Sequence, residues 1–201
     1  GRDGHVDYVL EGNLNYTGAV ITWLKDDLKL ITNPGETGEL AEKASQTDNL
    51  YLVPAFTGLG APYWDSSARA SFTGMDRTTT RNEIVRAAVE CIAYQISDIV
   101  KAMEEDSKVK ISELRVDGGP TKNSYLMQFQ SDILEAAVLI PEAEELSGIG
   151  AAYMAGLTMK VWDETVFRRM KRSQYQPKME EDIRQRKLTG WKKAVQSVLK
   201  G

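Results

Sequence analysis

Hydrophobic residues recur at helical spacing in several separate stretches of the chain. In the longest stretch, residues 81–105, apolar side chains recur every three or four residues and share one helical face. Thr80 and Glu83 have the spacing of a capping box, in which the two side chains satisfy backbone N–H groups where a helix starts. We therefore predict a long amphipathic helix that begins directly after Thr80.

Shorter apolar runs between the helical stretches predict strands. We expect strands over residues 6–10, 50–56, 70–74, 114–116 and 138–140. Helices are expected over residues 18–31, 39–44, 121–136 and 147–160, and further helical segments up to residue 199. Strands that alternate with helices indicate an α/β fold with right-handed crossovers. Because neither repeats nor a linker interrupt the chain, we read residues 1–201 as one domain.

Composition narrows the classes of function. Hydrophobic residues make up 42% of the chain and charged residues 27%, which argues against a disordered, collagen-like or coiled-coil protein. Cys91 is the only cysteine and His5 the only histidine. An internal disulfide is thus excluded, and a zinc site or a Ser-His-Asp triad is nearly so. No apolar run approaches the ~20 residues that cross a bilayer, and we expect a soluble, cytoplasmic protein with no membrane span.

Charge is distributed unevenly along the chain. The net charge is −4, but residues 160–201 contain 12 basic and 5 acidic side chains. A basic helical tail can bind nucleic acid, with Trp191 stacking on a base. The same tail can be a solvated helix face, and its apolar residues look like packing positions. We favour the second interpretation and expect no nucleic-acid partner.

A pair of glycines between a predicted strand and a predicted helix forms the first candidate site. Glycines allow a ligand to approach the backbone, and a helix N-terminus offers free N–H groups to an anion. Asn123, one turn further on, can hydrogen-bond a ribose or a purine edge. An ordinary tight reversal in an α/β unit is the alternative. The stretch reads Val116-Asp117-Gly118-Gly119-Pro120-Thr121-Lys122-Asn123.

Three further features carry weaker signals. Gly18 begins a helix, where it either admits a nucleotide or simply follows a turn, and the residues alone favour the second reading. Residues 70–90 should form core and crossover, with Glu90 a surface or capping partner rather than a general base. Small residues that repeat at every fourth position over 147–156 predict close helix packing rather than a site.

Longer signatures in the chain resemble those of a known family. Read position by position, residues 70–90 are similar to the C-terminal signature of the FGGY carbohydrate kinases. Residues 18–28, 50–65 and 114–134 resemble the corresponding stretches of family members that phosphorylate glycerol. The likeness covers nearly the whole chain and weakens near the C-terminus.

The resemblance implies a ribonuclease-H-like, actin-like ATPase lobe, with a mixed sheet flanked by helices. It implies that ATP or ADP binds with Mg²⁺, and that the γ-phosphate passes to a primary hydroxyl of a small sugar or polyol. Glycerol is the expected substrate. A pentulose such as xylulose or ribulose, and a non-catalytic nucleotide-binding relative, are the alternatives. The nucleotide contacts implied by the family fall on Gly18, Thr22, Gly118, Gly119 and Asn123.

The chain also departs from the family pattern. Where the family usually has Gln, this chain has the shorter Thr22, whose contact a bridging water can replace. The family's catalytic Asp, followed by Gln-Gln, and its threonine-glycine phosphate loop have no counterpart in residues 1–201. We therefore expect no catalytic residue and no metal ligand here, and expect most of the C-terminal nucleotide-binding domain, without the N-terminal lobe and the start of this lobe. An incomplete sheet exposes an edge, so a homo-oligomer is a further hypothesis.

Overall fold

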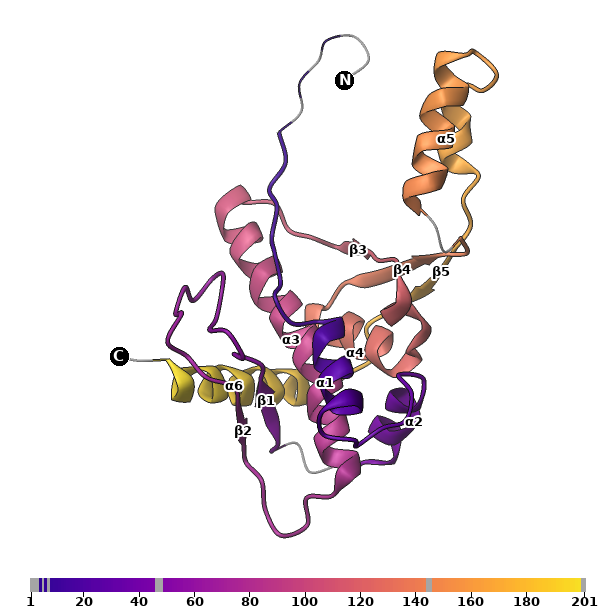
Figure 1. Ribbon diagram of the computed structural model, residues 1–201. Helices are drawn as coiled ribbons and strands as arrows, with labels where there is room; N and C mark the ends of the chain where they lie inside the picture. Colours follow the sequence, from indigo (N-terminus) through magenta and orange to yellow (C-terminus); the bar gives the residue numbers. More distant parts are fainter. Residues whose placement is uncertain (1–3, 5, 7, 46–48, 144–145, 200–201) are drawn as a thin grey trace.

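A long central helix, α3, organises the structure (Figure 1). The structure is a computed structural model that describes residues 4, 6, 8–45, 49–143 and 146–199. The helices are α1 (Gly18–Asp26), α2 (Glu36–Lys43), α3 (Arg81–Ser107), α4 (Ser124–Leu134), α5 (Leu146–Thr158) and α6 (Glu181–Val198), with 3₁₀ turns η1 (Gly119–Lys122) and η2 (Glu164–Arg168). The strands are β1 (Tyr51–Val53), β2 (Ser71–Thr73), β3 (Glu113–Arg115), β4 (Ala137–Pro141) and β5 (Arg172–Tyr175).

The strands form two small sheets on different sides of α3. β1 and β2 pair antiparallel, whereas the second sheet has the order β3-β4-β5. In this second sheet β3 and β4 run parallel, with Leu114 opposite Val138, and β5 runs antiparallel to β4. This sheet is thus mixed, as predicted, and α4 packs against it. The mixed α/β class expected from the sequence is confirmed.

Helix α3 begins where the sequence predicts. Thr80 and Glu83 form the capping box: the Thr80 backbone N–H donates to Glu83 Oε2 at 2.8 Å, and Thr80 Oγ1 accepts from the Asn82 N–H. Glu83 Oε1 also accepts the Ser45 N–H at 2.8 Å. The helix is buried on more sides than the single face that the spacing suggests, since α1, α2, α4 and β1 all pack against it.

A buried polar junction ties α6 to α3. The Trp191 side chain donates from Nε1 to Asp98 Oδ2 at 2.7 Å, and Tyr63 donates its hydroxyl to the same oxygen at 2.8 Å. The Trp191 ring also stacks on Tyr94, with centroids 5.1 Å apart. Burial raises the pKa of Asp98, although the bonds from Trp191 and Tyr63 oppose the shift. Trp191 is only 1% exposed and therefore cannot stack on a nucleic-acid base.

Several predicted boundaries and one predicted strand are wrong. The helix expected over 18–31 ends at Asp26, and the helix expected from 121 begins at Ser124, after a 3₁₀ turn. Of the strand expected over 6–10, the described residues 6 and 8–10 lie in no strand and expose their side chains, while Asp7 lies outside the described residues. The C-terminal region is not wholly helical: β5 pairs with β4 although its polar sequence shows no apolar alternation.

Glu90 is a buried residue, not the surface group that the sequence suggested. It is 4% exposed, accepts the Tyr125 hydroxyl at 2.6 Å, and lies 3.6 Å from Lys187 Nζ and 3.9 Å from Arg86 Nε. Two cations and a hydroxyl thus compensate a carboxylate inside the core, because an isolated buried charge would be very costly. Its role is to join α3, α4 and α6.

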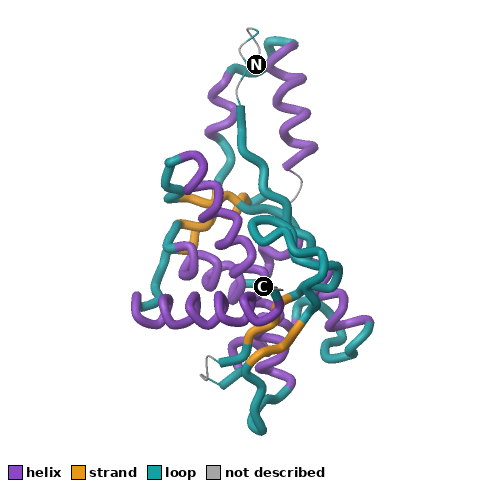
Figure 2. The backbone as a smooth tube through the Cα atoms, turned by 90° about the vertical axis from the view of Figure 1, so that its left-hand side faces the viewer, coloured by secondary structure: helices purple, strands orange, loops and turns teal. Residues whose placement is uncertain are grey.

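Helix α5 projects away from the body of the molecule (Figures 1 and 2). A Cβ atom added at Gly148 would meet nothing within 4 Å, whereas one at Gly156 would collide with Trp162. The prediction that the small residues over 147–156 pack closely against another element is therefore wrong at Gly148. It holds only at Gly156, against Trp162. Within the described ranges, no helix combines the length and the apolar character needed to cross a membrane.

The capping carboxylate should make stability depend on pH. Partial burial opposes ionisation of Glu83, but hydrogen bonds from Thr80 and Ser45 outweigh it and lower the pKa from 4.5 to about 2. A lowered pKa stabilises the fold above the unfolded value and ceases to do so as the pH falls toward the folded value. Glu83→Gln should therefore lower the free energy of unfolding by about 1 kcal/mol at pH 7. The difference from the wild type should disappear as the pH falls from 4.5 to about 2.

Urea unfolding across this pH range measures the effect. Glu105→Gln, at the exposed far end of the same helix, is the matched control and should change the free energy of unfolding by less than ~0.5 kcal/mol. A pH-independent difference between the wild type and Glu83→Gln would contradict the assignment.

Candidate functional site

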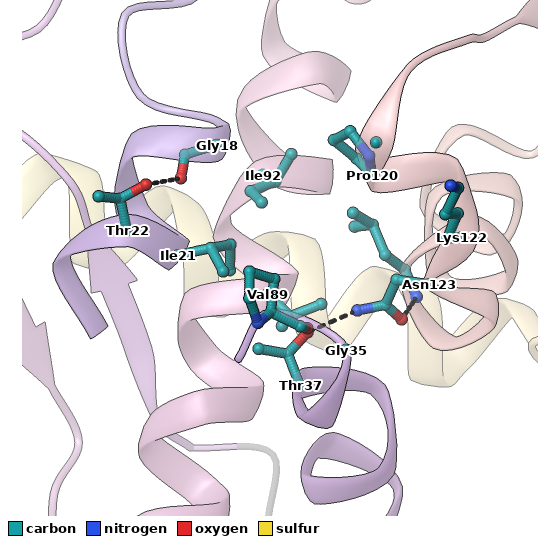
Figure 3. A pocket seen from close by; sticks show the side chains of 13 residues that line it. Gly18, Ile21, Thr22, Gly35, Thr37, Val89, Ile92, Pro120, Lys122 and Asn123 are labelled. Atoms are coloured by element: carbon teal, nitrogen blue, oxygen red, sulfur yellow. Dashed lines mark hydrogen bonds between the residues drawn. The ribbon is translucent and has the colours of Figure 1, made fainter. Parts of the chain in front are cut away.

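A cavity of about 340 Å³ lies between α1, the segment before α2, the middle of α3 and the turn before α4 (Figure 3). This size is within the ~300–1,000 Å³ range of small-molecule sites. Its walls are mainly apolar, and glycines and a few polar side chains complete the lining. The apolar walls come from Ile21, Pro34, Val89, Ile92, Pro120 and Leu126.

Four of the five predicted nucleotide contacts line this cavity. Gly18 and Thr22 come from α1, while Gly119 and Asn123 come from the turn before α4. The fifth, Gly118, lines a neighbouring cavity that shares Gly119 and Lys122 with the first. The structure thus brings together residues more than ninety positions apart in the sequence, and their contact with a nucleotide stays a prediction.

The glycines leave the backbone open at the cavity. A Cβ atom added at Gly18 or at Gly119 would meet no atom within 4 Å. Gly118 has φ +88°, a left-handed conformation that a residue with a side chain rarely adopts. A ligand can therefore approach the main chain closely at Gly18 and Gly119, while Gly118 allows the turn itself.

The Thr22 hydroxyl forms a hydrogen bond to the backbone of its own helix. The Gln that the family usually has at this position is longer. Thr22 Oγ1 donates to the Gly18 carbonyl oxygen at 3.3 Å, one helical turn earlier. The side chain nevertheless lines the cavity (Figure 3). The position is thus occupied by a short residue whose polar atom already has a backbone partner.

Asn123 is the N-cap of α4 rather than a residue one turn inside a helix. Its Oδ1 accepts the Leu126 backbone N–H at 3.0 Å, and its Nδ2 donates to Thr37 Oγ1 at 3.0 Å. Thr37 in turn donates to the Pro34 carbonyl oxygen at 2.7 Å. The helix expected from residue 121 begins only at Ser124, because Asn123 adopts an extended backbone conformation.

Sequence reasoning missed the wall of the cavity that precedes α2. Pro34, Gly35 and Thr37 line the site, but the Asn-Pro-Gly stretch signals only that a helix stops there. Glu36 holds this segment in place: its Oε1 accepts the Thr32 N–H at 2.9 Å, and Arg81 Nη2 lies 2.9 Å from its Oε2. No spacing rule links this segment to residues near position 120, so only the folded chain reveals it.

The site also includes Lys122, which the sequence placed in the glycine motif without a role. Among the residues that the structure describes, no three His, Cys, Asp or Glu side chains gather as they would around a metal ion. The cavity is lined by apolar side chains and open glycine backbone, with the Thr22 and Thr37 hydroxyls, the Asn123 amide and the Lys122 amine as its polar side-chain groups.

Comparison with known proteins identifies the family of the chain. Residues 1–159 match the model of the FGGY family of carbohydrate kinases, C-terminal domain. The chain belongs to the FGGY family of carbohydrate kinases. It is 44% identical over 200 residues to the glycerol kinase of Staphylococcus haemolyticus and 47% identical over 199 residues to that of Petrotoga mobilis. Each alignment covers 98% of this chain and 40% of the relative, so the FGGY chain spans less than half of their length.

Solved structures show the same FGGY fold. The crystal structure of Plasmodium falciparum glycerol kinase with ADP superposes with a TM-score of 0.84 at 39% identity, covering 92% of this chain and 37% of that one. Gluconate kinase from Lactobacillus acidophilus superposes with a TM-score of 0.76 at 21% identity, covering 90% of this chain and 38% of that one. The second likeness shows the fold alone. The ribonuclease-H-like, actin-like lobe expected from the sequence is thus confirmed.

The role of Asn123 as the N-cap of α4 can be tested by measuring stability. Asn123→Ala removes the cap of α4 and should lower the free energy of unfolding by about 1 kcal/mol. Asn123→Asp keeps an acceptor for the Leu126 N–H and adds a negative charge at a helix N-terminus, so it should retain most of the stability. Thermal and urea unfolding measure both variants. Equal stability of Asn123→Ala and the wild type would show that the side chain does not cap the helix.

Proposed function

We propose that this chain is the nucleotide-binding part of a kinase that transfers the γ-phosphate of ATP to a primary hydroxyl of glycerol. The observation that carries the proposal is the apolar cavity shared by Gly18, Thr22, Gly119 and Asn123. Support comes from the relatives named glycerol kinase and from the fold shared with a glycerol kinase solved with ADP.

The cavity has the properties that an adenine nucleotide needs. Apolar side chains such as Val89, Ile92 and Leu126 suit the faces of a flat base, since burial of apolar surface favours binding. The open backbone at Gly18 and Gly119 admits the ribose and phosphates without a Cβ in the way. Asn123 offers one N–H and one acceptor to a base edge or a ribose hydroxyl.

The role of this chain in phosphoryl transfer would be to bind and orient the nucleotide. Such reactions depend on positioning and on neutralisation of the phosphate charge. Mg²⁺ remains part of the proposal: bound together with the nucleotide, it would offset the negative charge that develops during phosphoryl transfer. We assign no metal ligand and no catalytic base to this chain, because the family's Asp-Gln-Gln stretch has no counterpart in its sequence.

Calorimetric titration with ADP tests the proposal directly. The chain should bind ADP weakly but saturably, and Gly119→Val should weaken binding at least tenfold, because its side chain would enter the space left open for the ligand. Gly148→Val is the matched control, since a Cβ there also meets nothing within 4 Å but lies on α5. Failure of the wild type to bind ADP would overturn the proposal.

Release of ADP from Mg-ATP tests the reaction and its substrate. The 201-residue chain alone should show no turnover. The full-length protein that contains this chain should turn over glycerol in preference to D-xylulose and D-ribulose. Preference for a pentulose would replace the substrate and keep the family, whereas nucleotide binding without turnover of any of the three would favour a non-catalytic relative.

We also propose that the chain associates with a second copy of itself. Strand β3 is at the edge of its sheet, and an exposed edge strand can pair with a second chain. Light scattering over a concentration series should show a mass that rises toward that of a homo-oligomer. A constant monomer mass would contradict it.

A further inference from the structure

We propose that Thr37 is a positioning residue that sets which way the Asn123 amide faces, and that it thereby makes the cavity prefer adenine to hypoxanthine. The inference rests on the proposed function, because it assumes that a purine nucleotide occupies the cavity. It adds a residue from a segment that lies 86 positions from Asn123 in the sequence.

The hydrogen bonds around Thr37 have a defined direction. The Pro34 carbonyl oxygen only accepts, so the Thr37 hydroxyl donates its proton there, at 2.7 Å. That hydroxyl then has lone pairs to offer, and the amide atom 3.0 Å away must be the donor Nδ2. At the other end of the amide, the Leu126 N–H only donates, so the atom facing it must be Oδ1. Both neighbours therefore select the same orientation (Figure 3).

The surroundings make this contact close and rigid. Thr37 is 2% exposed, so its hydroxyl exchanges little with water. A Cβ atom added at Gly38 would lie 3.0 Å from Asn123 Oδ1; the glycine thus lets α2 approach the amide. The ion pair with Arg81 and the hydrogen bond from Thr32 hold Glu36, and with it the start of α2 that carries Thr37. The wall that orients Asn123 is itself fixed to α3.

A fixed amide matches only one hydrogen-bond pattern. After its two protein contacts, Asn123 retains one N–H and one acceptor site for a ligand. Adenine presents an amino donor beside a ring-nitrogen acceptor, the pair that asparagine recognises. Hypoxanthine has a carbonyl oxygen in place of the amino group, so it places an acceptor against Oδ1. An amide held by the Leu126 N–H alone would give up one protein hydrogen bond to turn over, whereas an amide held also by Thr37 must give up two.

Titration with ADP and with inosine diphosphate tests the inference in one set of variants. The wild type should bind ADP more tightly, and in Thr37→Val this preference should fall about fivefold, the effect of one hydrogen bond. Thr37→Ser keeps the hydroxyl and should restore most of the preference. Thr158→Val removes a hydroxyl that donates to a helical carbonyl on α5, and it should leave the preference unchanged.

A second measurement does not depend on nucleotide. In NMR spectra of the wild type, the Asn123 side-chain amide protons should exchange with water more slowly than those of the exposed Asn13. Thr37→Val should accelerate that exchange. Equal rates at Asn123 and Asn13 would overturn the positioning role, even if Thr37→Val does not fold.

The outcomes separate the two proposals. A wild type that binds neither nucleotide overturns the proposed function and the base preference together. A wild type that binds both equally overturns only the inference about Thr37. The inference about Thr37 is also overturned if Thr37→Val loses affinity for both nucleotides by the same factor, because that is what a merely structural role would do.

Discussion

The fold depends on burying α3 from several sides at once. The helix has 27 residues, about 40 Å at 1.5 Å per residue, and α1, α2, α4 and β1 pack around it. This burial includes charged groups, which is tolerable only because Glu90 lies near Lys187 and Arg86 and accepts the Tyr125 hydroxyl. The capping box at Thr80 fixes where the helix begins, and the elements packed on it take their positions from there.

The candidate site follows from this central helix. Val89 and Ile92 form its floor, while segments from α1, α2 and the turn before α4 supply the other walls. These segments contribute few polar atoms, so each polar atom has a large effect on what can bind. The orientation of Asn123 is the clearest case, because its amide caps α4 and contacts Thr37 at the same time.

The predictions from sequence succeeded where a signal is local. Apolar spacing and the Thr80–Glu83 pair located α3, and the glycine pair marked the turn at Gly119, whereas Gly18 was singled out only by the family resemblance. Prediction failed where long-range packing decided the outcome. Strand β5 exists because β4 offers hydrogen bonds. Glu90 was misplaced because periodicity describes one face and cannot show that a helix is enclosed.

The sequence by itself determined the α/β class, the long central helix, the family resemblance and four residues that line the cavity. The class and the helix follow from spacing and capping, which act between neighbours along the chain, whereas the four cavity residues were singled out by the resemblance to the FGGY family. Only the tertiary structure decided that Thr37 meets Asn123, that Pro34 and Gly35 close a wall, and that Trp191 is buried. Such contacts join residues far apart in the sequence, and they form only when several elements pack on the same helix.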